Sequence, residues 1–104
     1  MRWYHVVAHF FGGAFFVNGI PHFTNGVSGR RFPTPWAYPP GRGRSPAVEN
    51  VLWGSLNLAI GYLLVFRVGT FDFRRTPDAL IFGVGGLLMA VMLSRAFAGR
   101  EGGE

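Results

Sequence analysis

The chain has 104 residues, contains no cysteine and carries a formal net charge of +5, with arginine at all ten of its Lys-plus-Arg positions. This length is enough for one domain, and we expect a single domain over residues 1–104. The lack of cysteine excludes disulfides, thiolate metal sites and thiol nucleophiles. A basic chain can also bind nucleic acid. Here the arginines flank apolar blocks and belong to no recognisable nucleic-acid module, so we predict no nucleic-acid partner.

Three long stretches of the chain carry no Asp, Glu, Lys or Arg. They are residues 3–29, 50–66 and 79–94, and the ten basic and five acidic residues all lie outside them. A soluble amphipathic helix would carry charges along one face, whereas a helix that crosses a bilayer needs about twenty mainly apolar residues. We therefore predict an all-α fold surrounded by lipid. It is a transmembrane bundle of three helices, with a long loop rich in Pro, Arg and aromatic residues between the first two.

The first predicted span covers residues 3–22 and begins with Trp3, a residue type that favours the headgroup level of a membrane. Pro21 lacks an N–H and disfavours helical geometry at the preceding residue, so the helix either ends there or continues past a kink. In the second case, Asn25 and Gly26 offer the next C-terminal cap. A cleaved signal peptide is the competing interpretation, but the apolar run is longer than a usual signal core and no Ala-x-Ala-like site follows it.

The predicted connector of residues 24–44 is long for a compact bundle, and such loops are usually functional or disordered. It contains four arginines, four prolines and three aromatic residues: Arg30, Arg31, Arg42, Arg44, Pro33, Pro35, Pro39, Pro40, Phe32, Trp36 and Tyr38. The prolines exclude a helix or a central strand, and the aromatic rings favour an interface over full disorder. We expect an extended segment that lies on the membrane surface or folds back over the helix ends.

The second predicted span, residues 46–68, begins at a Ser-Pro pair in which Ser45 is expected to act as N-cap, with Gly69 as its C-terminal cap. The third predicted span, residues 77–97, begins in the same way within a Thr-Pro-Asp sequence, and a glycine-rich tail follows it. Only the short connector 70–75 separates the two spans. We therefore expect the second and third helices to be antiparallel neighbours.

Small residues recur at helical spacing along all three predicted spans. The second span carries Asn50, Gly54, Asn57 and Gly61, the third carries Gly83, Gly86, Ala90 and Ser94, and the first carries Gly12, Phe16 and Gly19. Small side chains let membrane helices approach closely, and asparagines bond across the contact at roughly 1 kcal/mol or less each. We predict that the glycines pack the helices together: Gly12, Gly19, Gly54, Gly61, Gly83 and Gly86. A substrate or ion path lined by Asn18, Asn50 and Asn57 is the alternative interpretation.

All three histidines lie on the first predicted span. His5 and His9 are four residues apart and so share a helix face, a spacing that can supply two metal ligands. His22 lies about 25 Å from His5 along a continuous helix, at roughly 1.5 Å per residue, so one chain cannot close a site around the pair. Haem would need a homodimer that contributes His9 twice. We predict no metal and no cofactor.

His22 is the stronger functional candidate, because it follows Pro21 at a helix end where backbone carbonyls are freed, and imidazole titrates near neutral pH. Together with Asn18, Asn50 and Asn57 it forms the predicted candidate polar site at one membrane face. The alternative role is a polar anchor that satisfies the freed carbonyls. We expect no buried carboxylate in any span, and no nucleophile elbow, phosphate loop or His-Glu-x-x-His pair is present. We therefore predict no catalytic residues and no enzyme activity.

Three blocks of the sequence resemble a known family. They are Asn-Gly-Ile-Pro-His-Phe at 18–23, Phe-Pro-Thr-Pro-Trp at 32–36, and Asn-Val-Leu-Trp-Gly at 50–54 with Asn57. Together they resemble a family of small, uncharacterised bacterial integral membrane proteins with three spans. The resemblance covers most of the chain and implies a multi-pass protein of the bacterial cytoplasmic (inner) membrane, but it brings no assigned activity. The arginine distribution favours the long loop and the C-terminus in the cytosol and the N-terminus outside.

These observations give three hypotheses for function. The first is a structural or accessory subunit that self-associates as a homo-oligomer or joins other membrane subunits, because glycine stripes are present and reactive groups are absent. The second is a minimal transporter or channel subunit with its polar site at one membrane face. The third is a haem or metal redox subunit.

Overall fold

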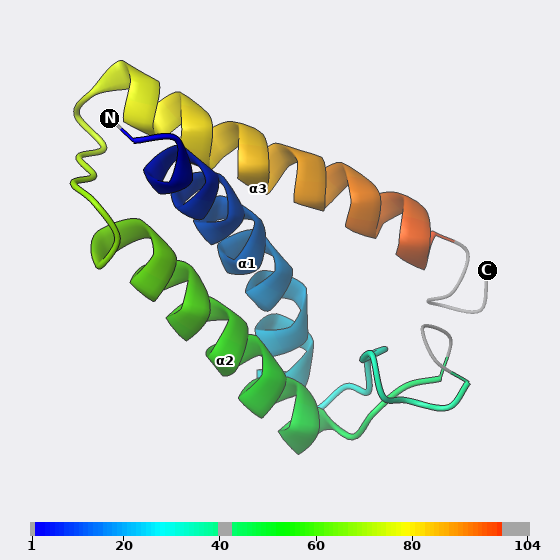
Figure 1. The fold of residues 1–104 in the computed structure, drawn as a ribbon. Helices are drawn as coiled ribbons and strands as arrows, with labels where there is room; N and C mark the ends of the chain where they lie inside the picture. Colours follow the sequence, from blue (N-terminus) through cyan, green and yellow to red (C-terminus); the bar gives the residue numbers. More distant parts are fainter. Residues whose placement is uncertain (1, 40–42, 99–104) are drawn as a thin grey trace.

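The computed structural model describes residues 2–39 and 43–98 and contains three α-helices (Figure 1). These are α1 (Trp3–Val27), α2 (Ala47–Phe66) and α3 (Thr76–Phe97). Within the described residues no strand forms beyond an isolated bridge in the long loop, and each helix is long and apolar enough to cross a membrane. The predicted all-α fold of three transmembrane helices is confirmed. Pro40, Arg42 and the predicted tail at 99–104 lie outside the described residues.

Helix α1 lies between the other two helices (Figure 1). It packs along both α2 and α3, while α2 and α3 touch one another far less. Helices α2 and α3 run antiparallel, but the prediction that they are packing neighbours is wrong. The connector between them crosses the N-terminal end of α1, where Val68 and Gly69 lie against the side chains of His9 and His5. The chain therefore returns along the far side of α1.

Small residues set the contact between α1 and α2. Three pairs recur every seven residues in opposite directions along the two helices: Gly12 with Gly61, Gly19 with Gly54, and Gly26 with Ala47. A Cβ added at Gly54 would lie only 2.9 Å from the carbonyl oxygen of Gly19, so the absence of a side chain is what permits this approach of the two backbones. A repeat of seven residues keeps one face of each helix against the other over several turns.

A second set of small residues joins α1 to α3. Gly13 lies against the backbone of Phe82, Gly85 against the backbone of Phe10, and Gly86 against the side chain of Val17. Gly83 instead faces open space, because an added Cβ would meet no atom within 4 Å outside its own helix. Gly83 therefore packs against neither α1 nor α2, and its predicted role in helix packing stays a prediction. Gly85 packs against α1 instead, since it lies on the buried face of α3.

Helix α1 continues to Val27, beyond the predicted boundary at residue 22, with Pro21 inside it. Proline removes one N–H and disturbs the preceding turn, but membrane helices tolerate this where neighbouring groups compensate. The last turn is held by α2, because Gly26 lies against the backbone of Ala47. The chain leaves the helix at Gly29, whose φ of 77° favours glycine. Tertiary contact thus extends the helix past its proline.

The start of α2 also differs from the prediction. Pro46 occupies the N-cap position, and no side chain caps the helix. Ser45, which was the predicted cap, pairs its hydroxyl with that of Thr34 at 2.6 Å and bridges its backbone to Phe32. The serine therefore fastens the loop instead of the helix. At its other end α2 finishes at Phe66, before the predicted boundary at residue 68.

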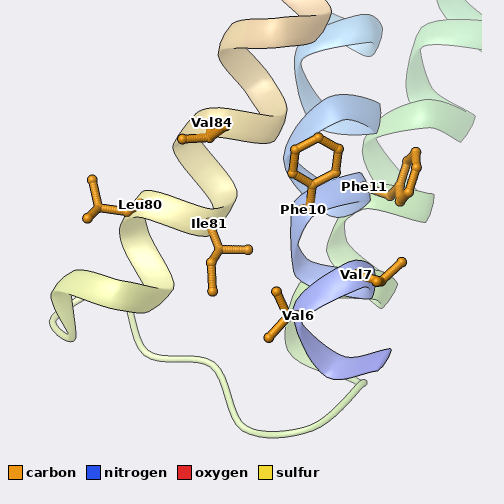
Figure 2. Close-up of a pocket in the computed structure, with 7 residues that line it drawn as sticks. All are labelled: Val6, Val7, Phe10, Phe11, Leu80, Ile81 and Val84. Carbon is orange, nitrogen blue, oxygen red and sulfur yellow. The ribbon is translucent and has the colours of Figure 1, made fainter. Parts of the chain in front are cut away.

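The outer surface of the three helices is apolar, as lipid contact requires. Large apolar side chains on every helix are exposed. An apolar groove of about 440 Å³ lies between the beginnings of α1 and α3, where Ile81 points toward Val6 while Leu80 and Val84 point away from α1 (Figure 2). The three apolar helices make the chain a multi-pass membrane protein.

Candidate functional site

Asn50, in the first turn of α2, is the centre of a buried polar cluster where α1 ends. Its side chain is fully buried. The Nδ2 atom donates to the carbonyl oxygens of Phe32, Ser45 and Pro46 at 3.0, 3.2 and 3.3 Å. The Oδ1 atom accepts from Nδ1 of His22 at 2.8 Å. One amide side chain therefore ties α1, α2 and the long loop together.

This network fixes the position of the proton on His22. Carbonyl oxygens only accept hydrogen bonds, so the Asn50 nitrogen must face the loop and its oxygen must face the imidazole. That oxygen also only accepts, so Nδ1 of His22 carries the hydrogen and Nε2 of the neutral ring is an acceptor. His22 is only 3% exposed, and none of the described residues bonds to its Nε2. The cluster thus contains one oriented and unused imidazole acceptor.

A second amide pair lies deeper in the bundle. Asn18 Nδ2 donates to Oδ1 of Asn57 at 2.9 Å, and Asn57 Nδ2 donates to the Trp53 carbonyl at 2.8 Å. Asn57 is fully buried and uses both ends of its amide. The Oδ1 atom of Asn18 has no partner in the part of the chain that the structure describes. The structure therefore joins the four predicted polar residues into two pairs, Asn18 with Asn57 and His22 with Asn50.

The long loop folds back over this cluster, which is one of its two predicted arrangements. An antiparallel bridge from Phe32 to the start of α2 closes the neck of the loop. The Phe32 ring lies 5.2 Å from that of His22 and 5.0 Å from that of Phe97, between centroids, so it joins α1 to α3. Trp36 packs edge-on against Trp53 with 5.2 Å between centroids. The loop is thus a cover for one end of the bundle.

A cavity of about 210 Å³ lies under the loop, beside the polar cluster. Its lining comes from all three helices and the loop: Asn18, His22, Pro33, Thr34, Pro35, Trp53, Leu93 and Phe97. None of these eight described residues is Asp, Glu, Lys or Arg. The cavity therefore combines a few uncharged polar groups with an apolar wall.

Sequence reasoning misses Trp53 as a site residue. Its ring lines the cavity with its centroid 6.4 Å from that of His22, and its Nε1–H is buried with no partner among the described residues. A buried N–H without an acceptor is costly, above all where no water is available. The spacing of Trp53 from the two asparagines of α2 could have identified it. It lies three residues after Asn50 and four before Asn57, and residues at these spacings are neighbours on a helix surface.

The other two histidines face the α2–α3 connector, far from the cavity. His9 is fully buried, and its Nε2 lies 2.6 Å from the Val68 carbonyl, so Nε2 is the donor in this bond. Its Nδ1 is buried and has no partner within the described residues. His5 lies against Gly69. Neither nitrogen of His9 is therefore open to a haem shared with a second copy.

Asp78 corrects the expectation that no span holds a buried carboxylate. It lies in the first turn of α3 with 1% of its surface exposed. Its Oδ2 accepts from the backbone N–H of Asp72 at 3.0 Å and forms an ion pair with Arg75 at 2.8 Å. The carboxylate thus clamps the connector to α3. Across residues 2–39 and 43–98, no three His, Cys, Asp or Glu side chains form a group that could hold a metal ion.

No protein-family model matches the chain, and neither a curated protein nor a solved structure does. The geometry of the site shows two chemical capacities. Paired amides and His22 close the contacts between helices and loop. The cavity beside them is lined by His22 and Trp53, and none of its described lining residues is charged.

Proposed function

We propose that the protein is a structural or accessory subunit of the bacterial cytoplasmic membrane, which works by associating with a second copy of itself through α3. One observation carries the proposal: a stripe of small residues on α3 is left uncovered. An added Cβ at Gly83 meets nothing within 4 Å, whereas every other glycine described in the helices lies against a neighbouring helix. Ala90 and Ser94 continue the stripe and are exposed.

Helix α3 is the least covered of the three helices. Only 11% of the residues in its apolar window are buried, against 39% in α1 and 28% in α2. Between membrane helices there is no hydrophobic driving force, so association depends on close van der Waals contact and on polar groups. The open space at Gly83 and Ala90 would let a second helix approach closely. Gly19 and Gly54 allow α1 and α2 to approach one another in the same way.

A second copy is the partner that this stripe fits best. In one membrane the two-fold axis of a dimer lies along the bilayer normal, so two α3 helices would meet in parallel and each stripe would face itself. Such an interface places identical residues opposite one another, which disfavours charged side chains. Gly83, Ala90 and Ser94 are all uncharged. The stripe therefore meets the requirement of a self-facing contact.

The lack of native cysteine makes single-cysteine crosslinking a direct test. Ala90→Cys is expected to form a disulfide-linked dimer under mild oxidation in membranes, because the bond requires Cα atoms about 4.4–6.8 Å apart. Leu88→Cys is the matched control, since Leu88 is 55% exposed at a similar depth. It lies about 200° around the helix from Ala90, at roughly 100° per residue, and is expected to crosslink several-fold less.

Two results would overturn the proposal. One is equal crosslinking of Ala90→Cys and Leu88→Cys, which indicates random collision. The other is no crosslinking of either variant together with only monomers in native mass spectra from mild detergent. Crosslinking of Ala90→Cys alone, with a dimer in those spectra, supports it.

The transporter and redox hypotheses stay predictions with their own tests. Asn57 and Asn50 use their amides in bonds that close the contacts of α2 with α1 and the loop, which favours a structural role for them. Proton or potassium flux into liposomes that is lost on Asn57→Leu and His22→Ala would favour transport instead. A Soret band or bound metal in the purified protein would favour the redox hypothesis.

A further inference from the structure

Beyond self-association, we propose that the cavity under the long loop binds a neutral amphiphile with a hydroxyl head and an apolar tail. The hydroxyl group donates its hydrogen to Nε2 of His22 and accepts the Nε1–H of Trp53. The apolar part lies along Leu93 and Phe97 of α3, which line the same cavity. Three features of the cavity support this inference. They are the His22 Nε2 acceptor, the Trp53 Nε1–H donor, and the lack of charged side chains among the described lining residues.

The His22 imidazole is a prepared acceptor. The bond from Nδ1 to Asn50 holds the ring in place, and Asn50 is itself held by the loop carbonyls. The fold therefore uses Nδ1 and, within the described residues, leaves Nε2 without a bond. Asn18 lines the same cavity, and its Oδ1 is a second acceptor to which no described residue donates. Both acceptors favour a ligand that donates a hydrogen bond.

Trp53 supplies the complementary donor. Its ring is fixed by edge contacts with Trp36 and His22, and its buried Nε1–H lacks an acceptor among the described residues. The Trp53 and His22 rings are 6.4 Å apart between centroids, so one small head group can serve both. A hydroxyl is the smallest uncharged group that both donates and accepts. An ether or ketone head would satisfy Trp53 only.

The size and charge of the cavity narrow the class further. A cavity of about 150 Å³ is enough to hold benzene, so the 210 Å³ here accommodates a ring-sized head and the beginning of a tail. None of the described residues that line the cavity is Asp, Glu, Lys or Arg, so an ionised head would lose its hydration without gaining a counter-charge from them. A neutral head avoids this penalty.

The experiment uses the full chain in lipid nanodiscs and three probes of similar size: para-hexylphenol, para-hexylanisole and hexylbenzene. The phenol both donates and accepts a hydrogen bond, the anisole only accepts, and hexylbenzene does neither. Binding is followed through the His22 ring nitrogens in nitrogen-15 NMR, with each affinity corrected for partitioning into empty nanodiscs. We expect the phenol to bind about three- to ten-fold more tightly than the anisole, as one additional hydrogen bond predicts.

A matched pair of tryptophan variants separates the site from general lipid partitioning. Trp53→Phe keeps an aromatic ring beside His22 but removes the N–H, and we expect it to weaken phenol and anisole binding by about three- to ten-fold. Hexylbenzene binding should stay unchanged. Trp3→Phe is the control, because Trp3 begins α1, is 75% exposed and does not line this cavity, and all three affinities should stay unchanged. His22→Leu is not used, because it removes both the ring nitrogens that report binding and the hydrogen-bond partner of Asn50.

Two outcomes would overturn the inference. Equal corrected affinities for the three probes, or an unchanged phenol affinity in Trp53→Phe, would show that hydrogen bonding does not select the ligand. No change at the His22 nitrogens with any probe would show that none of these probes binds beside His22. Neither outcome bears on association through α3, which the cysteine crosslinks test separately.

Discussion

Gly54 of α2 provides a direct test of the helix contact on which the fold depends. In Gly54→Ala, the new Cβ would lie 2.5 Å from the Phe23 nitrogen and 2.9 Å from both the Gly19 oxygen and the Phe23 Cα. Favourable contacts between carbon atoms lie at about 3.5–4.0 Å. All three obstructing atoms belong to the α1 backbone and cannot rotate away. The two helices must therefore separate locally, by roughly 1 Å on this comparison.

Two costs follow from this separation. Overpacking by one methyl group typically costs about 1–3 kcal/mol. The displacement also strains the nearby bond between Asn18 and Asn57, now 2.9 Å long, and such bonds between membrane helices are worth about 1 kcal/mol. We therefore expect Gly54→Ala to lower the free energy of unfolding by about 2–4 kcal/mol. Reversible unfolding in mixed detergent and SDS micelles measures this change.

Gly83→Ala is the matched control for this prediction. It adds the same methyl group to a membrane helix, but that group meets nothing within 4 Å. At a dilution that keeps the chain monomeric, we expect Gly83→Ala not to lower the unfolding free energy and to raise it by up to about 1 kcal/mol, because alanine favours a helix over glycine. If the two substitutions destabilise the protein equally, close approach of the α1 and α2 backbones is not the source of stability.

Two further predictions concern the loop and the topology. Asn50→Leu is expected to lower the unfolding free energy by about 2 kcal/mol or more, since it leaves the buried Nδ1–H of His22 without its acceptor and removes the bonds from Asn50 to the loop carbonyls. It should also speed tryptic cleavage in the loop, and unchanged cleavage would show that Asn50 does not hold the loop. A membrane-impermeant maleimide is expected to label Thr70→Cys in intact cells but Ser28→Cys only after lysis, because we place the long loop in the cytosol. The reverse pattern would invert the topology.

The three spans and part of the polar cluster were predictable because each depends on a single helix. Lipid imposes a long charge-free stretch on every span, whatever its neighbours are. Asn50 and Asn57 are seven residues apart, so helical spacing alone places them on one face of α2. Both are fully buried in the structure. Their partners on α1 are Asn18 and His22. This pairing depends on how α1 and α2 pack against one another, which the spacing within one helix does not determine.

The order of the helices was not predictable, because a stripe of small residues shows where a helix can be approached but not by which neighbour. Gly83 and Gly85 are both small residues of α3, yet only Gly85 meets α1. The short connector indicated contact between α2 and α3, whereas its residues cross over His9 and place α1 in the middle. The loop posed the same difficulty, because Ser45 has the local pattern of a helix cap but pairs with a residue far back in the sequence, Thr34.

The part of α1 that follows Pro21 links the fold to the cavity. Sequence rules disfavour a helix here, and the structure maintains it through Gly26 against Ala47 and His22 against Asn50. If the helix ended at Pro21, the His22 ring would have no fixed direction. The Oδ1 atom of Asn50 would then lose the Nδ1–H of His22, from which it accepts a hydrogen bond. The fixed direction of the imidazole acceptor, to which no described residue bonds, therefore depends on the continued helix. Pro21, which disfavours this helical turn, directly precedes His22, to which we assign ligand binding. The bond from His22 to Asn50 both stabilises the turn and orients the His22 ring.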